Sequence, residues 1–288
     1  MKTKMRLFGL LFALLVLAGN VFAGPELISA KELKGKMKDK NVIIVSTRTF
    51  SDYQQVHLPG AVNVWHIDLY TDPTANGYIK SPEELAKIFG SKGISETKTI
   101  VLYDAGSGKN SGRLYWILKY LGAKDVRILD GQMKGWRAQR GAVTKAPAKV
   151  EAVTFTPSVQ KAIFVSTAQV SAAKGKSGTV VVDVRSAEEF NGTDETDIRK
   201  GHIPGAVNLE FKNVLTDAAT FKSPEELKKI FTAKGITADK EIILYCRTSV
   251  RAGIVYFALT DMLGYKNVKV YDKAFIGWQS ASANQVVK

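Results

Sequence analysis

The chain has 288 residues, enough for two domains, and its 45% hydrophobic and 24% charged residues are typical of a globular protein. A formal charge of +14 favours anionic partners. The basic residues are scattered and form no stripe or recognisable nucleic-acid module, so we expect a small anion as the partner and no nucleic acid.

The first 23 residues have the pattern of an export signal. Lys2, Lys4 and Arg6 precede an apolar run from residue 7 to 18, and the small residue Ala23 ends the segment. This pattern predicts a signal peptide cleaved after Ala23. We therefore expect a periplasmic protein. No other apolar run approaches the length of a membrane span, so we expect no stable membrane association after cleavage.

The remaining chain contains one unit twice. Residues 57–63 and 202–208 both read His-Leu/Ile-Pro-Gly-Ala-Val-Asn. From Ser81, which corresponds to Ser223, the second copy follows the first at a constant offset of 142 residues. An internal repeat of this kind indicates two copies of one fold. We place the first domain at residues 24–145, a linker at 146–160 and the second domain at 161–288.

Each copy alternates strands with helices. Ser81 and Ser223 each precede a proline and stand three residues before a glutamate, which predicts a capped helix start. The apolar runs of strand length are residues 42–45, 99–103, 126–129, 180–184, 241–245 and 268–271. Such alternation predicts an α/β fold in which a parallel sheet carries helices on both faces.

The segment 241–264 holds the only cysteine, Cys246. It follows a strand and precedes an apolar pattern of helical spacing from residue 250 to 263, which Gly264 ends. A thiol at the carboxyl end of a parallel strand faces a helix N-terminus, and here Arg247 and Arg251 flank it; all of these favour the thiolate. A lone cysteine is more often an inert apolar residue. Two neighbouring cations argue against that interpretation, because an apolar site would not recruit them.

Comparison of the copies assigns the chemistry to the second one, because the position of Cys246 is Asp104 in the first. His57 and His202 occur in both copies, so we interpret them as residues that stabilise a turn. His66 has no histidine counterpart and is a weak candidate for lining a cleft. For Trp65, His66, Lys109 and Asn110 we expect core packing or surface exposure.

The tandem copies resemble the two-domain rhodanese family, the thiosulfate and 3-mercaptopyruvate sulfurtransferases. The resemblance rests on Gly-His-Ile-Pro-Gly-Ala at 201–206, Asp183-Val-Arg185, and Cys246-Arg-x-x-x-Arg251. It implies two tandem rhodanese-like domains, an active-site cysteine in the second, and a site in the cleft between them. It also implies that Arg185 helps to bind the substrate anion, and that the segment 188–199 lies beside the site.

A thiolate at Cys246 is suited to attack the outer sulfur of thiosulfate and expel sulfite, leaving a persulfide that cyanide or a thiol then discharges. We expect Arg247 and Arg251 to hold the sulfonate oxygens. Backbone N–H groups of Thr248, Ser249 and Val250 would stabilise the persulfide. No metal or organic cofactor is needed.

Three other functions are compatible with parts of this pattern. A 3-mercaptopyruvate donor is less favoured, because the loop after Cys246 differs from the Gly-Ser-Gly-Val-Thr loop of the 3-mercaptopyruvate enzymes. In addition, Glu189 stands near the place of the second arginine of those enzymes. A cysteine phosphatase needs Cys-x5-Arg, whereas Ala252 occupies that position. A non-catalytic carrier that passes a persulfide to a partner protein needs the same Cys246 and remains open.

Overall fold

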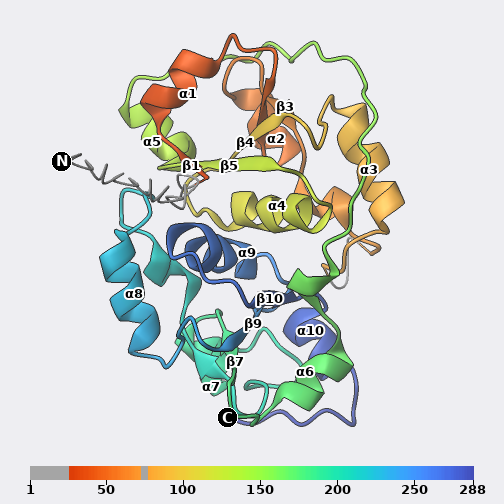
Figure 1. Ribbon diagram of the computed structural model, residues 1–288, viewed down its shortest axis with the longest axis vertical. Helices are drawn as coiled ribbons and strands as arrows, with labels where there is room; N and C mark the ends of the chain where they lie inside the picture. Colours follow the sequence, from red (N-terminus) through yellow and green to blue (C-terminus); the bar gives the residue numbers. More distant parts are fainter. Residues whose placement is uncertain (1–25, 73–76) are drawn as a thin grey trace, which may run out of the picture.

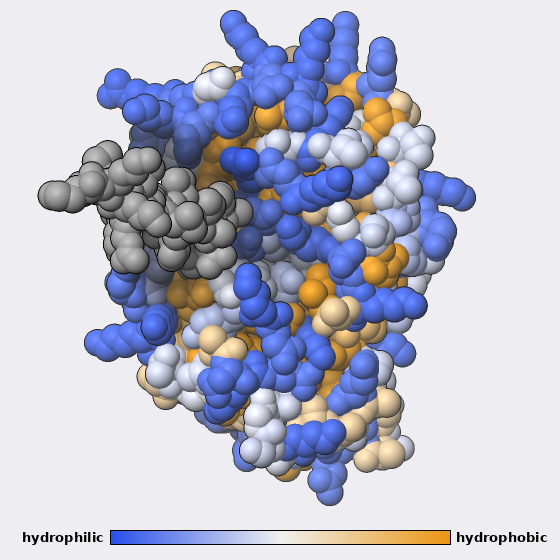
Figure 2. Space-filling view, viewed as in Figure 1, coloured by the Kyte–Doolittle hydropathy of each residue, from blue (hydrophilic) through white to orange (hydrophobic). Residues whose placement is uncertain are grey.

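The computed structural model describes residues 26–72 and 77–288. The expected signal peptide, residues 1–23, lies outside these ranges and stays a prediction. Among the described residues, no helix has both the length and the apolar character needed to cross a membrane. Figure 2 shows hydrophilic residues over most of one face of the molecule, with hydrophobic residues exposed only in small separate areas.

The first domain follows the predicted alternation of strands and helices. Its strand 99–103 has the predicted bounds, and the two neighbouring strands differ from the predictions by one residue. Its elements are β1 (Leu27–Ile28), α1 (Ala30–Lys36), β2 (Val42–Ser46), α2 (Phe50–Gln55), β3 (Val62–Asn63), the short 3-10 helix η1 (His66–Leu69), α3 (Pro82–Ser91), β4 (Thr99–Tyr103), α4 (Lys109–Tyr120), β5 (Asp125–Leu129) and α5 (Gln132–Ala138).

The second domain repeats this order, with α7 in the place of α2, and adds the short helices η2 and η4. The helix predicted at 250–263 is an α-helix followed by a π-helical turn that ends before Gly264. The elements are η2 (Lys161–Ile163), β6 (Phe164–Val165), α6 (Thr167–Ala173), β7 (Thr179–Asp183), α7 (Ala187–Asn191), β8 (Val207–Asn208), η3 (Phe211–Val214), α8 (Pro224–Thr232), β9 (Glu241–Tyr245), α9 (Ala252–Phe257), η4 (Ala258–Met262), β10 (Val268–Tyr271) and α10 (Ala274–Gln279).

Each domain forms a five-stranded sheet in which every pairing between neighbouring strands is parallel. The strand order is β1-β5-β4-β2-β3 in the first sheet and β6-β10-β9-β7-β8 in the second. The predicted α/β class with parallel sheets is therefore confirmed. In the second sheet β9 lies between β10 and β7, so its carboxyl end opens at the centre of the sheet edge, where ligands of such folds bind.

Helices cover both faces of each sheet, as the near-continuous apolar strands predict. Along β9, Ile242 and Leu244 face one apolar core, while Ile243 and Tyr245 face another on the opposite side. The first of these cores is shared, because it also contains β4 residues such as Ile100 and helix residues from both domains. The outer faces carry separate cores, beneath α1 and α5 in one domain and beneath α6 and α10 in the other.

The helices α4 and α9 lie against each other between the two sheets (Figure 1). Their backbones approach closely at two glycines. A Cβ atom on Gly112 would lie 2.3 Å from the backbone nitrogen of Ile254, and one on Gly253 would lie 2.2 Å from the carbonyl oxygen of Gly112. This contact brings the N-terminal end of α4 beside the loop that contains Cys246.

The capped helix starts are confirmed. In both Ser81 and Ser223 the hydroxyl accepts the N–H of the glutamate three residues later, and that glutamate accepts the backbone N–H of the serine. The histidines found in both copies hold the turns by contacts with backbone carbonyls. Nδ1 of His57 lies 2.7 Å from the oxygen of Tyr53, and Nδ1 of His202 lies 2.9 Å from that of Phe190.

Candidate active site

Cys246 follows the last residue of β9, and the loop 247–251 connects it to α9. The carbonyl oxygen of Cys246 accepts the N–H of Phe275 at 2.9 Å, which ties the loop to α10. Ser249 has a φ of 60°, unusual for a residue other than glycine, and its hydroxyl donates to the carbonyl oxygen of Tyr271 at 2.6 Å. The cysteine side chain is fully buried beneath this loop.

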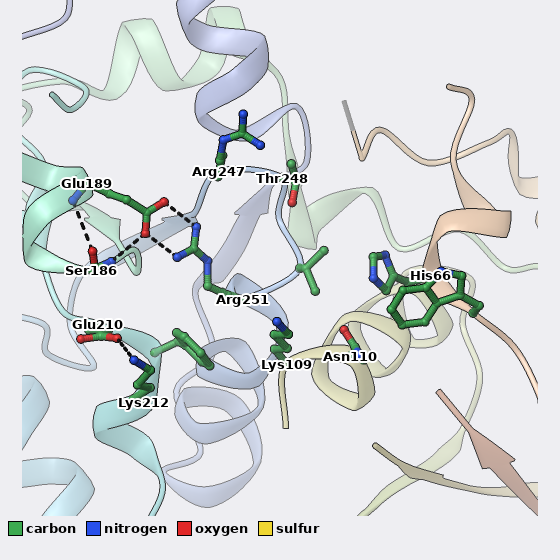
Figure 3. A pocket seen from close by; sticks show the side chains of 13 residues that line it. His66, Lys109, Asn110, Ser186, Glu189, Glu210, Lys212, Arg247, Thr248 and Arg251 are labelled. Carbon is green, nitrogen blue, oxygen red and sulfur yellow. Dashed lines mark hydrogen bonds and ion pairs between the residues drawn. The ribbon is translucent and has the colours of Figure 1, made fainter. Parts of the chain in front are cut away.

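A pocket of about 660 Å³ lies over the loop, between the domains (Figure 3). Both domains contribute to its wall. The second domain contributes Ser186, Glu189, Glu210, Phe211, Lys212, Arg247, Thr248, Val250 and Arg251. The first domain contributes Trp65, His66, Lys109 and Asn110.

All four of these first-domain residues line the pocket, which the sequence left open. The expected packing or exposure holds for two of them, because His66 is buried and Lys109 is exposed. The contact between α4 and α9 carries Lys109 and Asn110 to the second domain, and η1 carries His66 there. No periodicity in the sequence encodes such a contact between distant segments. The only sequence signal was that His66 lacks a histidine counterpart in the second copy.

Arg251 forms a two-point ion pair with Glu189, through Nη1 at 2.5 Å and Nη2 at 2.8 Å. Burial by itself would lower the pKa of Arg251, but hydrogen bonds to Glu189 and Cys246 raise it above its ordinary value. The pKa of Glu189 is raised by burial and lowered more by Arg251, with a net decrease. The pair therefore stays ionised, and Arg251 interacts electrostatically with both Glu189 and Cys246.

Arg247 is directed toward Asp197, with Nε 2.9 Å from Oδ1, and its side chain is one-third exposed. In Figure 3 it points away from Arg251. The two arginines expected beside the thiol are thus each paired with a carboxylate of the segment 188–199, Arg251 with Glu189 and Arg247 with Asp197. Neither guanidinium group is free of an anionic partner.

Arg185 does not line the pocket. It is fully buried and donates to Asp183, Asp197 and the carbonyl oxygen of Gly201. Its guanidinium group also lies 3.9 Å from the ring centroid of Phe275. In this structure it does not reach the place where the family resemblance implies contact with substrate. It holds Asp197, which in turn holds Arg247.

Thr248 and Val250 line the pocket, whereas the side chain of Ser249 is buried against Tyr271. Within the part of the chain that the structure describes, the backbone N–H groups of Arg247, Thr248, Ser249 and Val250 have no acceptor. Amide groups of this loop are therefore available to an anion at the floor of the pocket.

The corresponding loop of the first domain shows what such amides bind. The carboxylate of Asp104 accepts the N–H of Gly106 at 2.8 Å, of Gly108 at 3.1 Å and of Asn110 at 3.2 Å. The backbone of the two loops also differs, because the left-handed residue is Gly108 in the first but Ser249, one position earlier in the repeat, in the second. In the first domain an anion attached to the residue after the strand occupies the loop.

His66 lies beside Trp65, with ring centroids 4.1 Å apart, and its Nδ1 is 2.8 Å from the hydroxyl of Tyr70. Burial, assisted by Arg113 and Lys109, lowers the pKa of His66 to about 3, so the ring is neutral at neutral pH. Burial raises the pKa of Tyr70 to about 12. His66, which lines the pocket, therefore presents an uncharged ring to it.

Two parallel-sheet domains, with one cysteine loop at the sheet edge of the second, define a tandem α/β protein. The Rhodanese-like domain family matches residues 29–139 and 166–281. The chain belongs to this family and is a rhodanese-type sulfurtransferase.

Relatives in other organisms match most of the chain. A putative thiosulfate sulfurtransferase of Mycolicibacterium smegmatis is 32% identical over 251 residues, which cover 84% of this chain and 89% of that protein. The sulfur carrier protein TtuD of Thermus thermophilus is 34% identical, and the match covers 89% of this chain and 95% of that protein. A putative thiosulfate sulfurtransferase of Haloferax volcanii is 35% identical, with 78% and 81% covered.

Solved structures share the tandem fold. SseA of Escherichia coli, described as a 3-mercaptopyruvate sulfotransferase, has a TM-score of 0.80 and 27% identity, with 87% of this chain and 99% of that chain covered. An EanB variant described with a cysteine persulfide and ergothioneine has a TM-score of 0.82 and 25% identity, with 91% and 70% covered.

Proposed function

We propose that the protein is a thiosulfate sulfurtransferase that carries the transferred sulfur as a persulfide on Cys246. The observation that supports this most directly is the loop of Asp104, in which three amides hold a carboxylate. A carboxylate on Cβ and a persulfide on Cβ both place a negatively charged atom two bonds beyond Cβ. The second domain has a thiol at the same loop position, and its loop amides have no acceptor among residues 26–72 and 77–288.

The proposed reaction has two steps. The Cys246 thiolate attacks the outer sulfur of thiosulfate, a sulfur–sulfur bond forms, and the original sulfur–sulfur bond breaks with its electron pair leaving on sulfite. The acceptor, cyanide or a thiolate, then attacks the outer sulfur of the persulfide and returns the electron pair to Cys246. Covalent catalysis replaces one difficult transfer by two easier ones.

The surroundings of Cys246 support this chemistry. Both steps have anionic reactants and products, so fixed positive charge and amide donors lower their barriers. Electrostatic interaction with Cys246 raises the pKa of Arg251, and Glu189 fixes the orientation of its guanidinium group. Because Cys246 itself is covered, the donor sulfur has to approach through the pocket floor formed by Thr248, Val250 and Arg251.

Two other functions share this site. The similarity in fold to SseA supports 3-mercaptopyruvate as an alternative donor. The 34% identity to TtuD supports a second alternative, a sulfur carrier that delivers to a protein acceptor. Steady-state kinetics separates them. Thiosulfate turnover with cyanide supports the proposed enzyme, preference for 3-mercaptopyruvate supports the first alternative, and one round of loading with negligible release supports the carrier.

Intact-mass analysis after treatment with thiosulfate tests the intermediate. We expect a gain of one sulfur atom on the wild-type protein and none on Cys246→Ser, which should also lose turnover. Full activity of Cys246→Ser would overturn the mechanism. Export stays a proposal based on residues 1–23, and it requires that the protein from the natural host begins at Gly24. N-terminal sequencing of that protein tests it.

A further inference from the structure

The pocket contains four cationic side chains that differ in one respect. Three of them are paired with carboxylates, and these pairs are Arg251 with Glu189, Arg247 with Asp197, and Lys212 with Glu210 at 3.0 Å. Lys109 lines the same pocket and has no carboxylate partner among residues 26–72 and 77–288. An approaching anion meets an uncompensated charge only at Lys109.

The packing of α4 explains why a first-domain residue reaches this pocket. Lys109 is the first residue of α4, and the preceding Gly108 packs against the second domain, where a Cβ atom would lie 3.0 Å from Cδ1 of Ile254. Figure 3 shows Lys109 between Arg251 and Asn110, with its ammonium end toward the loop of the second domain. In the internal repeat, Lys109 corresponds to Arg251. The contact of α4 with α9 thus brings two equivalent cations to one pocket.

Asn110 adds a polar group beside this charge. It lines the pocket, and its Oδ1 is buried without a hydrogen-bond partner. Its backbone N–H is already used by Asp104, so the side-chain amide alone is available. The Oδ1 is an acceptor and does not bind an anion, but the Nδ2 of the same amide is a donor. The ammonium group of Lys109 and this Nδ2 are together suited to a small oxyanion such as a sulfonate or carboxylate.

We infer that Lys109 is the residue that recognises the oxyanion group of the sulfur donor, and that the first domain therefore determines donor affinity. This inference rests on the proposed function of the same pocket. The physical reason is that an ion-paired arginine presents a nearly neutral group, whereas a free ammonium attracts a dianion with its full charge. Arg251 acts on the sulfur atom and Lys109 acts on the oxygens.

Binding is measured first without chemistry. Isothermal titration calorimetry of thiosulfate with Cys246→Ser, which forms no persulfide, gives the dissociation constant directly. We expect Lys109→Met in that background to raise this constant at least tenfold and Lys109→Arg to restore most of the affinity. The matched control is Lys228→Met, an exposed lysine of α8 outside the pocket, which removes the same charge elsewhere. Because Lys109 is exposed, its substitution leaves the core intact.

Kinetics gives a second readout. In a two-step reaction, kcat/KM for the donor and for the acceptor are determined separately. We expect Lys109→Met to lower kcat/KM for thiosulfate tenfold and to leave that for the acceptor within about twofold. A Lys109→Met protein that matches Lys228→Met in both measurements would overturn the inference. If the wild-type protein fails to load sulfur, the proposed function fails, and the calorimetric comparison still decides the role of Lys109.

Discussion

Arg113 of α4 and Asp272, which follows β10, form an ion pair across the domain boundary, with Nη2 2.7 Å from Oδ1 and both side chains fully buried. Asp272 also accepts the backbone N–H of Ile79 at 3.1 Å. The repeat contains the reciprocal contact, in which Asp130 accepts the N–H of Phe221 at 3.0 Å. Each domain therefore binds the backbone of the other through an equivalent carboxylate, and one of these carboxylates has a buried cation.

Arg113→Met should destabilise the protein by about 3–5 kcal/mol, because it leaves the carboxylate of Asp272 buried without its partner. Urea denaturation gives the free energy of unfolding. The double variant Arg113→Met/Asp272→Asn should recover much of the loss, since no unpaired charge remains. Arg127→Met is the control; it breaks the pair with Asp125, in which both side chains are about one-third exposed, and should cost less than about 1 kcal/mol. Equal costs for the two single variants would contradict this account.

Gly112→Ala should destabilise the domain boundary by about 1–3 kcal/mol or more, because its methyl group would lie 2.3 Å from the backbone of Ile254. Backbone atoms cannot move aside as a side chain can. Gly35→Ala in α1 is the control, because nothing lies within 4 Å of its Cβ position. Alanine there should increase the free energy of unfolding by at most about 1 kcal/mol. Thermal unfolding of both variants tests the contrast, and a stabilised Gly112→Ala protein would disprove the close helix contact.

A second polar cluster between the domains predicts a pH dependence. The hydroxyl of Tyr115 lies 2.7 Å from Glu26 and also contacts Asp261. A hydroxyl has one proton, so both contacts are satisfied only when one carboxyl group is protonated. Burial, and then the charge of Asp261, raise the pKa of Glu26 from 4.5 to about 7, although Lys119 at 3.0 Å opposes this.

Because the pKa of Glu26 is higher in the folded than in the unfolded protein, its contribution to stability is present at pH 4.5 and below and is lost as the pH rises to about 7. The pKa of His66 is lowered by folding, so the contribution of His66 to stability is lost as the pH falls below 6.5. This dependence on pH is opposite to that of Glu26. The test is therefore the difference between the wild-type protein and Glu26→Gln in urea denaturation at pH 5, 6 and 7.5. We expect the variant to gain about 1–2 kcal/mol relative to wild type across this range. Parallel pH profiles would contradict the prediction.

Glu189→Gln should release Arg251 from its ion pair and so add an unpaired cation to the pocket. We expect the KM for thiosulfate to fall about twofold to fivefold, the effect of one partly exposed ion pair of about 0.5–1 kcal/mol. Steady-state kinetics measures this, and Glu225→Gln, an exposed glutamate of α8 away from the pocket, is the matched control. An unchanged or raised KM would contradict the expectation that the charge of Glu189 weakens donor binding.

The internal repeat, the six longer strands and the place of Cys246 could be predicted from the sequence, whereas the two-residue strands β1, β3, β6 and β8 were not. Strands 99–103, 241–245 and 268–271 have the predicted bounds, because a short apolar run ended by a polar residue specifies a buried strand locally. The capped helices at Ser81 and Ser223 were equally predictable, since the cap and its partner are three residues apart. The constant offset then identified the one loop with a thiol.

The composition of the pocket depended on the tertiary structure. The sequence places Arg247 and Arg251 beside the thiol, but only the path of the segment 188–199 pairs them with Asp197 and Glu189. Similarly, Lys109 reaches the pocket because two glycines let α4 and α9 approach closely. Secondary structure follows from neighbouring residues, whereas the charge that a pocket presents depends on which distant side chains the packed domains bring together.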